Sequence, residues 1–148
     1  ERLARDYFTF LRESPARVEV VLGDARLSLD REPPQRFHVL VLDAFSGDAI
    51  PTHLLTVEAM RIWLRHLAPG GTLAVHISNR HLDLAPVVRG VARRFGLKAE
   101  EIAFDRGESR SVSSSRWMLC TAGESPVGEE ERVWTDDRID LFSILRWR

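Results

Sequence analysis

Residues 37–51 read FHVLVLDAFSGDAIP, and this stretch predicts the class of fold. Its four consecutive apolar residues, 39–42, end abruptly at Asp43. A continuous run of β-branched residues and leucine is typical of a strand that is buried on both faces, and such strands belong to parallel sheets. Ligands of open α/β sheets bind beyond the carboxyl ends of the strands, so we expect Asp43 to face a functional site.

Strands and helices alternate along the rest of the chain. The patterns predict strands at 18–22, 72–77, 100–104 and 116–121, and helices at 1–8, at 25–29, from a cap at Thr56 to the Pro-Gly-Gly turn at 69–71, and from a cap at Asp83 to Gly96. This alternation, followed by two adjacent strands, predicts a three-layer α/β domain. We expect a mostly parallel sheet that ends in an antiparallel C-terminal hairpin.

The composition excludes several classes of protein. A chain of 148 residues is long enough for one domain with a real core. Its formal net charge of −1 gives no electrostatic footprint for nucleic acid, and no apolar run approaches the roughly 20 residues that cross a bilayer. The single cysteine, Cys120, excludes an internal disulfide and fits a reducing compartment. We therefore expect a cytoplasmic protein, or the cytoplasmic domain of a membrane protein.

Four pieces of the sequence together resemble the spermidine synthase family, within the fold of S-adenosylmethionine-dependent methyltransferases. They are VLGDA at 21–25, VLDAFSGD at 41–48, LAPGGTL at 67–73, and the paired strands near the end. In addition, Thr-Asp-Asp at 135–137 is similar to a segment of the family's membrane-fused branch. The resemblance runs from about Tyr7 to the C-terminus. It implies a Rossmann-like methyltransferase fold and transfer of an aminopropyl group from decarboxylated S-adenosylmethionine to a small amine, without a metal.

The resemblance also implies that this domain is incomplete. In the family, the first strand leads into a Gly-rich loop that holds the cofactor tail, and the second strand ends in an acid that binds the ribose. This chain has no two glycines at i, i+2, and its first residues read as the middle of a helix. We therefore expect the first two strands and this loop to lie upstream of Glu1. The parent protein can then carry membrane helices, as some relatives do, and these 148 residues alone should have little transferase activity.

The expected missing strands have a physical consequence. In the family's strand order, 3-2-1-4-5-7-6, they lie between the strands predicted here at 18–22 and 37–42. Without them, backbone N–H and C=O groups lose their partners, at about 1–3 kcal/mol for each buried group. We expect the chain to close the gap by direct pairing of these two strands, by strand exchange in a homodimer, or by displacement of its first segment.

The resemblance implies roles for three residues around the cofactor. Asp43 would bind it and also act as the catalytic carboxylate that orients the amine and accepts its proton. Asp24 would accept a hydrogen bond from the adenine amino group, and Ala25 would add a backbone contact. Purely structural roles stay open for both acids. An Asp that follows a Gly at a strand end, such as Asp24, is also an ordinary helix N-cap, and Asp43 can cap the loop that follows it.

Three further residues are candidates for substrate binding. Asp48 is a second carboxylate that can grip a cationic amine, although two extra residues separate it from Asp43 compared with the family pattern. His76, near the end of the predicted strand at 72–77, can line the pocket together with Ser78, Asn79 and His81, or these can simply be polar loop residues. His76 and His81 have no third ligand at a suitable spacing, so the sequence predicts no metal site.

Three other functions remain as alternatives. A methyltransferase of the same fold would share the cofactor site and would often need no base. A scaffold domain of this fold would bind a partner without catalysis. A receiver-type signalling domain also has an Asp after an apolar strand. That fold needs a Lys after a later strand as well, whereas Lys98, the single lysine here, lies past the end of a predicted helix.

Overall fold

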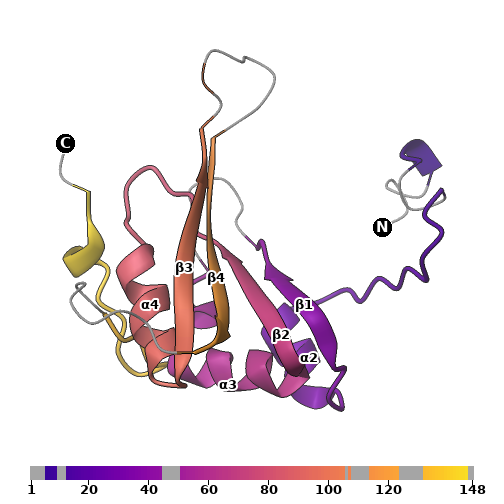
Figure 1. The fold of residues 1–148 in the computed structure, drawn as a ribbon, viewed down its shortest axis with the longest axis horizontal. Coiled ribbons are helices and arrows are strands. Elements are labelled where there is room, and N and C mark those ends of the chain that lie inside the picture. Colours follow the sequence, from indigo (N-terminus) through magenta and orange to yellow (C-terminus); the bar gives the residue numbers. More distant parts are fainter. Residues whose placement is uncertain are drawn as a thin grey trace.

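The computed structural model describes residues 6–9, 13–44, 51–105, 107, 114–123 and 132–146 (Figure 1). Its helices are α2 (Ala25–Arg31), α3 (Val57–His66) and α4 (Ala85–Arg93), with 3-10 turns η1 (Thr52–Leu54) and η2 (Phe142–Ile144). Its strands are β1 (Phe37–Leu42), β2 (Leu67–His76), β3 (Leu97–Phe104) and β4 (Ser115–Ala122). Of the helix predicted at 1–8, Asp6 and Tyr7 are helical, and residues 1–5 lie outside the described ranges.

The four strands form one sheet in the order β1-β2-β4-β3. β1 and β2 are parallel, whereas β4 runs antiparallel to both β2 and β3. This order matches the 4-5-7-6 part of the family's sheet, so the α/β class and the antiparallel C-terminal hairpin are confirmed. The described sheet is mixed rather than mostly parallel, because it lacks the parallel strand predicted at 18–22.

The strand predicted at 18–22 is wrong. These residues run outside the sheet on their way to α2 (Figure 1), and Leu22 at their end is 74% exposed. Apolar residues give a segment the tendency to form a strand, but the strand itself needs a neighbour for its backbone hydrogen bonds. Direct pairing of 18–22 with β1 is therefore also wrong. Strand exchange between two chains stays a prediction.

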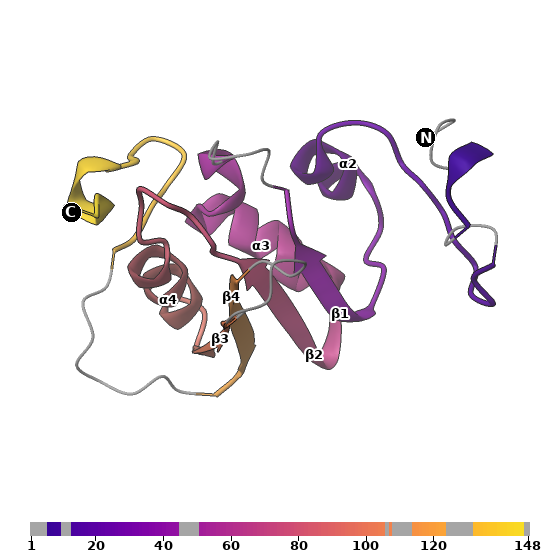
Figure 2. The same cartoon turned by 90° about the horizontal axis from the view of Figure 1, so that it is seen from above.

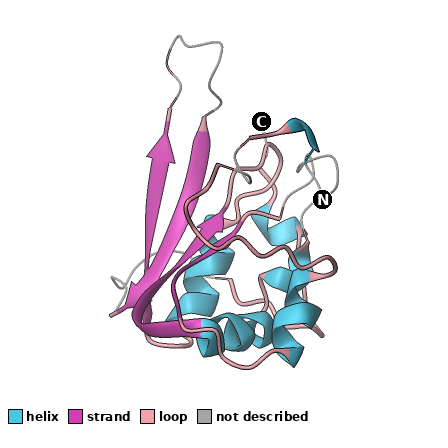
Figure 3. Cartoon of the chain, turned by 90° about the vertical axis from the view of Figure 1, so that its right-hand side faces the viewer, coloured by secondary structure: helices cyan, strands magenta, loops and turns pink. Residues whose placement is uncertain are grey.

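The described helices cover one face of the sheet. Figure 3 shows the strands on one side and the helices on the other, and Figure 2 shows α2, α3 and α4 side by side along that face. On the opposite face of β1, Val39 is 59% exposed and Val41 is 52% exposed. The prediction that β1 is buried on both faces is therefore wrong in the described part of the chain. That part forms two of the three predicted layers, the sheet and the helices on one of its faces (Figure 3).

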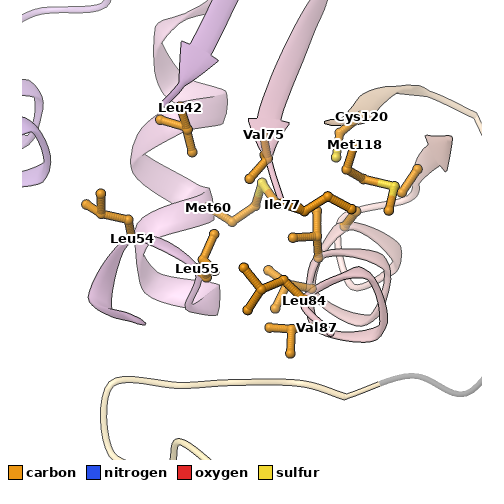
Figure 4. Close-up of a cluster of buried hydrophobic side chains, with 14 of the residues drawn as sticks. Leu42, Leu54, Leu55, Met60, Val75, Ile77, Leu84, Val87, Met118 and Cys120 are labelled. Atoms are coloured by element: carbon orange, nitrogen blue, oxygen red, sulfur yellow. The ribbon is translucent and has the colours of Figure 1, made fainter. Parts of the chain in front are cut away.

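The core lies between the sheet and α3 and α4 (Figure 4). Leu42, Val75 and Met118 project from three adjacent strands onto Met60 of α3 and Leu84 before α4. This packing fixes the carboxyl ends of β1 and β2 next to each other, which places their terminal polar residues at the same edge.

The ends of the helices agree with their capping signals to within a few residues. Thr56 caps α3, and its side chain accepts a hydrogen bond from the Ala59 N–H. That helix ends at His66, before the predicted Pro-Gly-Gly turn, because the chain enters β2 at once and the turn produces a register shift against β1. At α4 the cap is Leu84 rather than the predicted Asp83.

Candidate functional site

Asp43 stands directly after β1, beside the carboxyl end of β2. The Nδ1 atom of His76, the last residue of β2, lies 2.7 Å from Oδ1 of Asp43. The side chain of Asp43 is 55% exposed and that of His76 is 22% exposed. The structure thus brings together two of the predicted site residues, and more than half of the Asp43 side chain is exposed.

Contacts with Asp43, Ser78 and Trp117 hold the His76 side chain. Besides Asp43, its Nε2 atom lies 2.7 Å from the Ser78 hydroxyl oxygen, which accepts a 2.8 Å hydrogen bond from the backbone N–H of Arg116. The imidazole also stacks on the Trp117 ring, with 4.7 Å between the ring centroids and 19° between the planes. The register of β2 against β4 pairs His76 with Trp117 and so produces the stack. Sequence reasoning missed Trp117 as a part of the site, and it did not predict the contact between Ser78 and His76.

Asp24 is the N-cap of α2, which is the structural role that the sequence predicts for it as the alternative to cofactor binding. Its Oδ1 accepts a 2.9 Å hydrogen bond from the Leu27 N–H, and its Oδ2 lies 3.0 Å from Nε2 of His53. The hydrogen bond from Leu27 and the one with His53 hold the pKa of the Asp24 carboxyl below its ordinary value. Among the described residues, Asp24 contacts the start of α2 and His53 rather than Asp43.

A cavity of about 550 Å³ lies beside the next candidate, Ala25. It is lined by the segment before α2, by α2 itself and by the start of β1, including Arg17, Val21, Gly23, Ala25, Leu29 and Phe37. Ala25 and Asp43 therefore lie at different places along the molecule: the first lines this cavity, and the second lies at the edge where β1 and β2 end.

The other two candidates for substrate binding are Asn79 and Asp48. The Asn79 side-chain oxygen accepts hydrogen bonds from the backbone N–H groups of His81, at 2.9 Å, and Leu82, at 2.8 Å. Asn79 thus shapes the turn that follows β2. Asp48 lies outside the described residues, which resume at Pro51.

An ion-pair network missed by the sequence analysis joins α2 to α3 and to the C-terminal segment. The Arg26 guanidinium donates to both carboxylate oxygens of Asp136, at 2.8 and 2.5 Å, and the Thr56 hydroxyl donates to the first of them at 2.8 Å. The Asp136 backbone N–H donates to Glu58. Arg26 and Thr56 hold the pKa of Asp136 below its ordinary value. In this chain, the Thr-Asp-Asp segment therefore holds α2 against α3.

In the described ranges, no group of three or more His, Cys, Asp or Glu side chains is arranged to hold a metal ion. No helix in the described part of the chain is both long and apolar enough to cross a bilayer.

Comparison with known proteins gives one curated relative and several solved structures, while no family model matches the chain. The relative is the polyamine aminopropyltransferase of Vibrio vulnificus (strain CMCP6), which is 34% identical over 77 residues. This match covers 51% of the chain and 25% of the relative. The chain thus spans about a quarter of the curated relative that it matches.

The solved structures share the fold. A probable spermidine synthase from Corynebacterium glutamicum ATCC 13032 has a TM-score of 0.57 and 23% identity, over 82% of this chain and 43% of its own. The spermidine synthase from Thermotoga maritima has a TM-score of 0.56 and 14% identity, over 92% of this chain and 50% of its own. These similarities confirm the predicted resemblance: the chain is similar to spermidine-synthase-like proteins and has the fold of S-adenosylmethionine-dependent methyltransferases.

Proposed function

We propose that this chain is the amine-binding part of an aminopropyltransferase domain, which uses decarboxylated S-adenosylmethionine and a small cationic amine. One observation carries the proposal: Asp43 lies at the carboxyl end of β1, is held by His76 on one oxygen, and keeps 55% of its side chain exposed. The similarity to a polyamine aminopropyltransferase supports this choice among the functions that the fold can host.

The proposed chemistry needs a carboxylate at this position. A primary amine has a pKa near 10.4, so freeing its lone pair at neutral pH costs about 4–5 kcal/mol. Asp43 can accept a hydrogen bond from the ammonium group and take one of its protons as the new C–N bond forms. The amine nitrogen attacks the carbon next to the sulfonium, the C–S bond breaks, and its electron pair stays on sulfur as a neutral thioether.

The residues proposed for the co-substrate fit this role in part. Each oxygen of Asp24 already has one partner, but a carboxylate offers about four lone-pair positions, so it can still accept a bond from an adenine amino group. Ala25 lines the neighbouring cavity of about 550 Å³. On the amine side we keep His76, Asn79 and Asp48 as the proposed pocket residues. No metal is needed for the transfer.

We also propose that these 148 residues alone have little or no activity, because their sequence contains no G-x-G pair to hold the co-substrate tail. The test is aminopropyl transfer by the chain alone and by a longer protein that includes the sequence encoded upstream. Turnover by the longer protein only is the expected result. Measurable turnover by the 148 residues would contradict the proposal of an incomplete site.

Isothermal titration of the same longer protein distinguishes aminopropyl transfer from its alternatives. We expect decarboxylated S-adenosylmethionine to bind more tightly than S-adenosylmethionine. The opposite preference would favour a methyltransferase. Binding of neither compound would favour a non-catalytic domain of the same fold.

A further inference from the structure

A continuous chain of hydrogen bonds crosses the carboxyl edge of the sheet and ends on Asp43. It starts at the backbone N–H of Arg116 in β4, passes through the Ser78 hydroxyl and the His76 imidazole, and reaches Oδ1 of Asp43. The three donor–acceptor distances are 2.8, 2.7 and 2.7 Å. All three lie within the range of good hydrogen bonds.

The Asp43 end of this chain sets the arrangement of protons, and the Ser78 end is compatible with it. An ionised Asp43 can only accept, so Nδ1 of His76 must carry a hydrogen. A neutral imidazole has one N–H, which makes Nε2 an acceptor for the Ser78 hydroxyl hydrogen. At the other end, the Arg116 backbone N–H can only donate, so it occupies one lone pair of Ser78, and the hydroxyl hydrogen of Ser78 is available for Nε2 of His76.

The surroundings also fix the orientation of the ring. Trp117 stacks on one face of His76, and the side chain of His76 is 22% exposed. Both ring nitrogens are occupied by Asp43 and Ser78, so a ring flip would break two short hydrogen bonds. The imidazole is therefore a rigidly held partner of Oδ1 of Asp43, whose side chain is 55% exposed.

We propose that His76 is a positioning residue for Asp43: Ser78 holds it in the Nδ1–H tautomer, and it reserves the second oxygen of Asp43 for the ammonium group of the amine. This role rests on the proposed aminopropyl transfer. A carboxylate that is already held in one rotamer loses no further side-chain freedom when it binds and orients a cation. In this account His76 acts through Asp43 and does not itself touch the reacting atoms.

The same order of groups, Ser-His-Asp, is found in serine hydrolases, where the Ser is the nucleophile. Here the Ser78 oxygen already accepts the Arg116 backbone N–H, which lowers its readiness to attack. Labelling of the 148-residue chain with a fluorophosphonate probe tests this directly. We expect no labelling of Ser78, and stoichiometric labelling that is lost in Ser78→Ala would overturn the positioning role in favour of a nucleophilic one.

The tautomer can be measured in the chain itself. Long-range ¹H–¹⁵N correlation spectra of histidine-labelled protein report which ring nitrogen carries the hydrogen, and His76→Asn assigns the signal by its loss. We expect His76 to be in the Nδ1–H form at neutral pH, whereas the exposed His38 on β1 serves as the internal control for an unconstrained ring. A spectrum of His76 like that of His38, or an Nε2–H form, would overturn the proposal.

Kinetics of the longer protein test the functional part, with 1,4-diaminobutane as the amine. We expect His76→Ala to raise KM for the amine about tenfold with a much smaller change in KM for decarboxylated S-adenosylmethionine, and His76→Asn, which keeps a donor near the Nδ1 position, to recover most of the loss. Equal changes in both KM values, or no recovery by Asn, would contradict positioning. If the wild-type longer protein transfers no aminopropyl group, the proposed function is contradicted. The tautomer of His76, measured separately, then still tests whether its Nδ1–H is held by Asp43.

Discussion

Replacing Asp136 by Asn tests whether the Arg26–Asp136 pair stabilises the fold. Asn keeps one acceptor oxygen, so the contact from Thr56 can survive, but one of the two Arg26 contacts and the ionic attraction are lost. Arg26 is 16% exposed and is left with an unpaired N–H, whereas Asp136 is 41% exposed and is partly screened by water. A charge-assisted hydrogen bond contributes about 1.5–3 kcal/mol, and this exposure lowers the expected loss to about 1–2 kcal/mol.

The pH dependence of this loss has a definite sign. The folded state holds the pKa of Asp136 below its ordinary value, so its contribution is fully present above the unfolded pKa of about 3.9 and is lost as the pH falls through the folded value. The difference in unfolding free energy between wild type and Asp136→Asn should therefore be constant from about pH 5 to 7 and shrink below about pH 4.

Urea unfolding followed by tryptophan fluorescence measures both effects. Asp137→Asn is the matched control, because it removes the same charge from the neighbouring exposed side chain and should change the unfolding free energy by less than about 0.5 kcal/mol. Equal losses in the two variants would refute the reasoning. So would a loss in Asp136→Asn that stays the same down to the lowest pH at which the chain folds.

Three further predictions concern the core. Gly90→Ala would place a Cβ 2.3 Å from the Arg132 carbonyl oxygen, so calorimetry should show a loss of about 1–3 kcal/mol; an unchanged melting temperature would show that these two backbones are not in contact. Trp63→Phe removes the 3.1 Å hydrogen bond to the Leu54 carbonyl and should cost about 1–3 kcal/mol in urea unfolding, whereas an equally stable variant would contradict this contact. Burial raises the pKa of the Cys120 thiol to about 12, so a thiol reagent at neutral pH should modify the native chain far more slowly than the unfolded one, and equal rates would mean that the thiol is exposed.

Much of the fold could be predicted because its signals are local. The strand Phe37–Leu42 agrees with the prediction at both ends, since an apolar run bounded by polar residues specifies it without help from distant parts. The cap at Thr56 is equally local. The segment 18–22 fails because a strand depends on a neighbour that its own sequence cannot supply. The burial of β1 on both faces fails for a similar reason: Val39 and Val41 are apolar, but no described helix covers them.

The site was predictable only in outline. The sequence placed Asp43 and His76 at the carboxyl ends of neighbouring strands, and the structure adds that their side chains meet. The stack of His76 on Trp117 depends on the register of β2 against β4, which no local pattern encodes. The pair of Arg26 and Asp136 is separated by 110 residues and depends on tertiary packing in the same way.

The most direct test of the central claim compares wild type with Asp43→Asn in the longer protein. If Asp43 accepts the proton of the attacking amine, turnover should fall by about 10²–10⁴-fold, the usual contribution of a general base. The dissociation constant of decarboxylated S-adenosylmethionine, measured by isothermal titration on the same two proteins, should change by no more than a few-fold. Equal losses in turnover and affinity, or undiminished turnover, would contradict the account and leave Asp43 as a structural residue at the end of its strand.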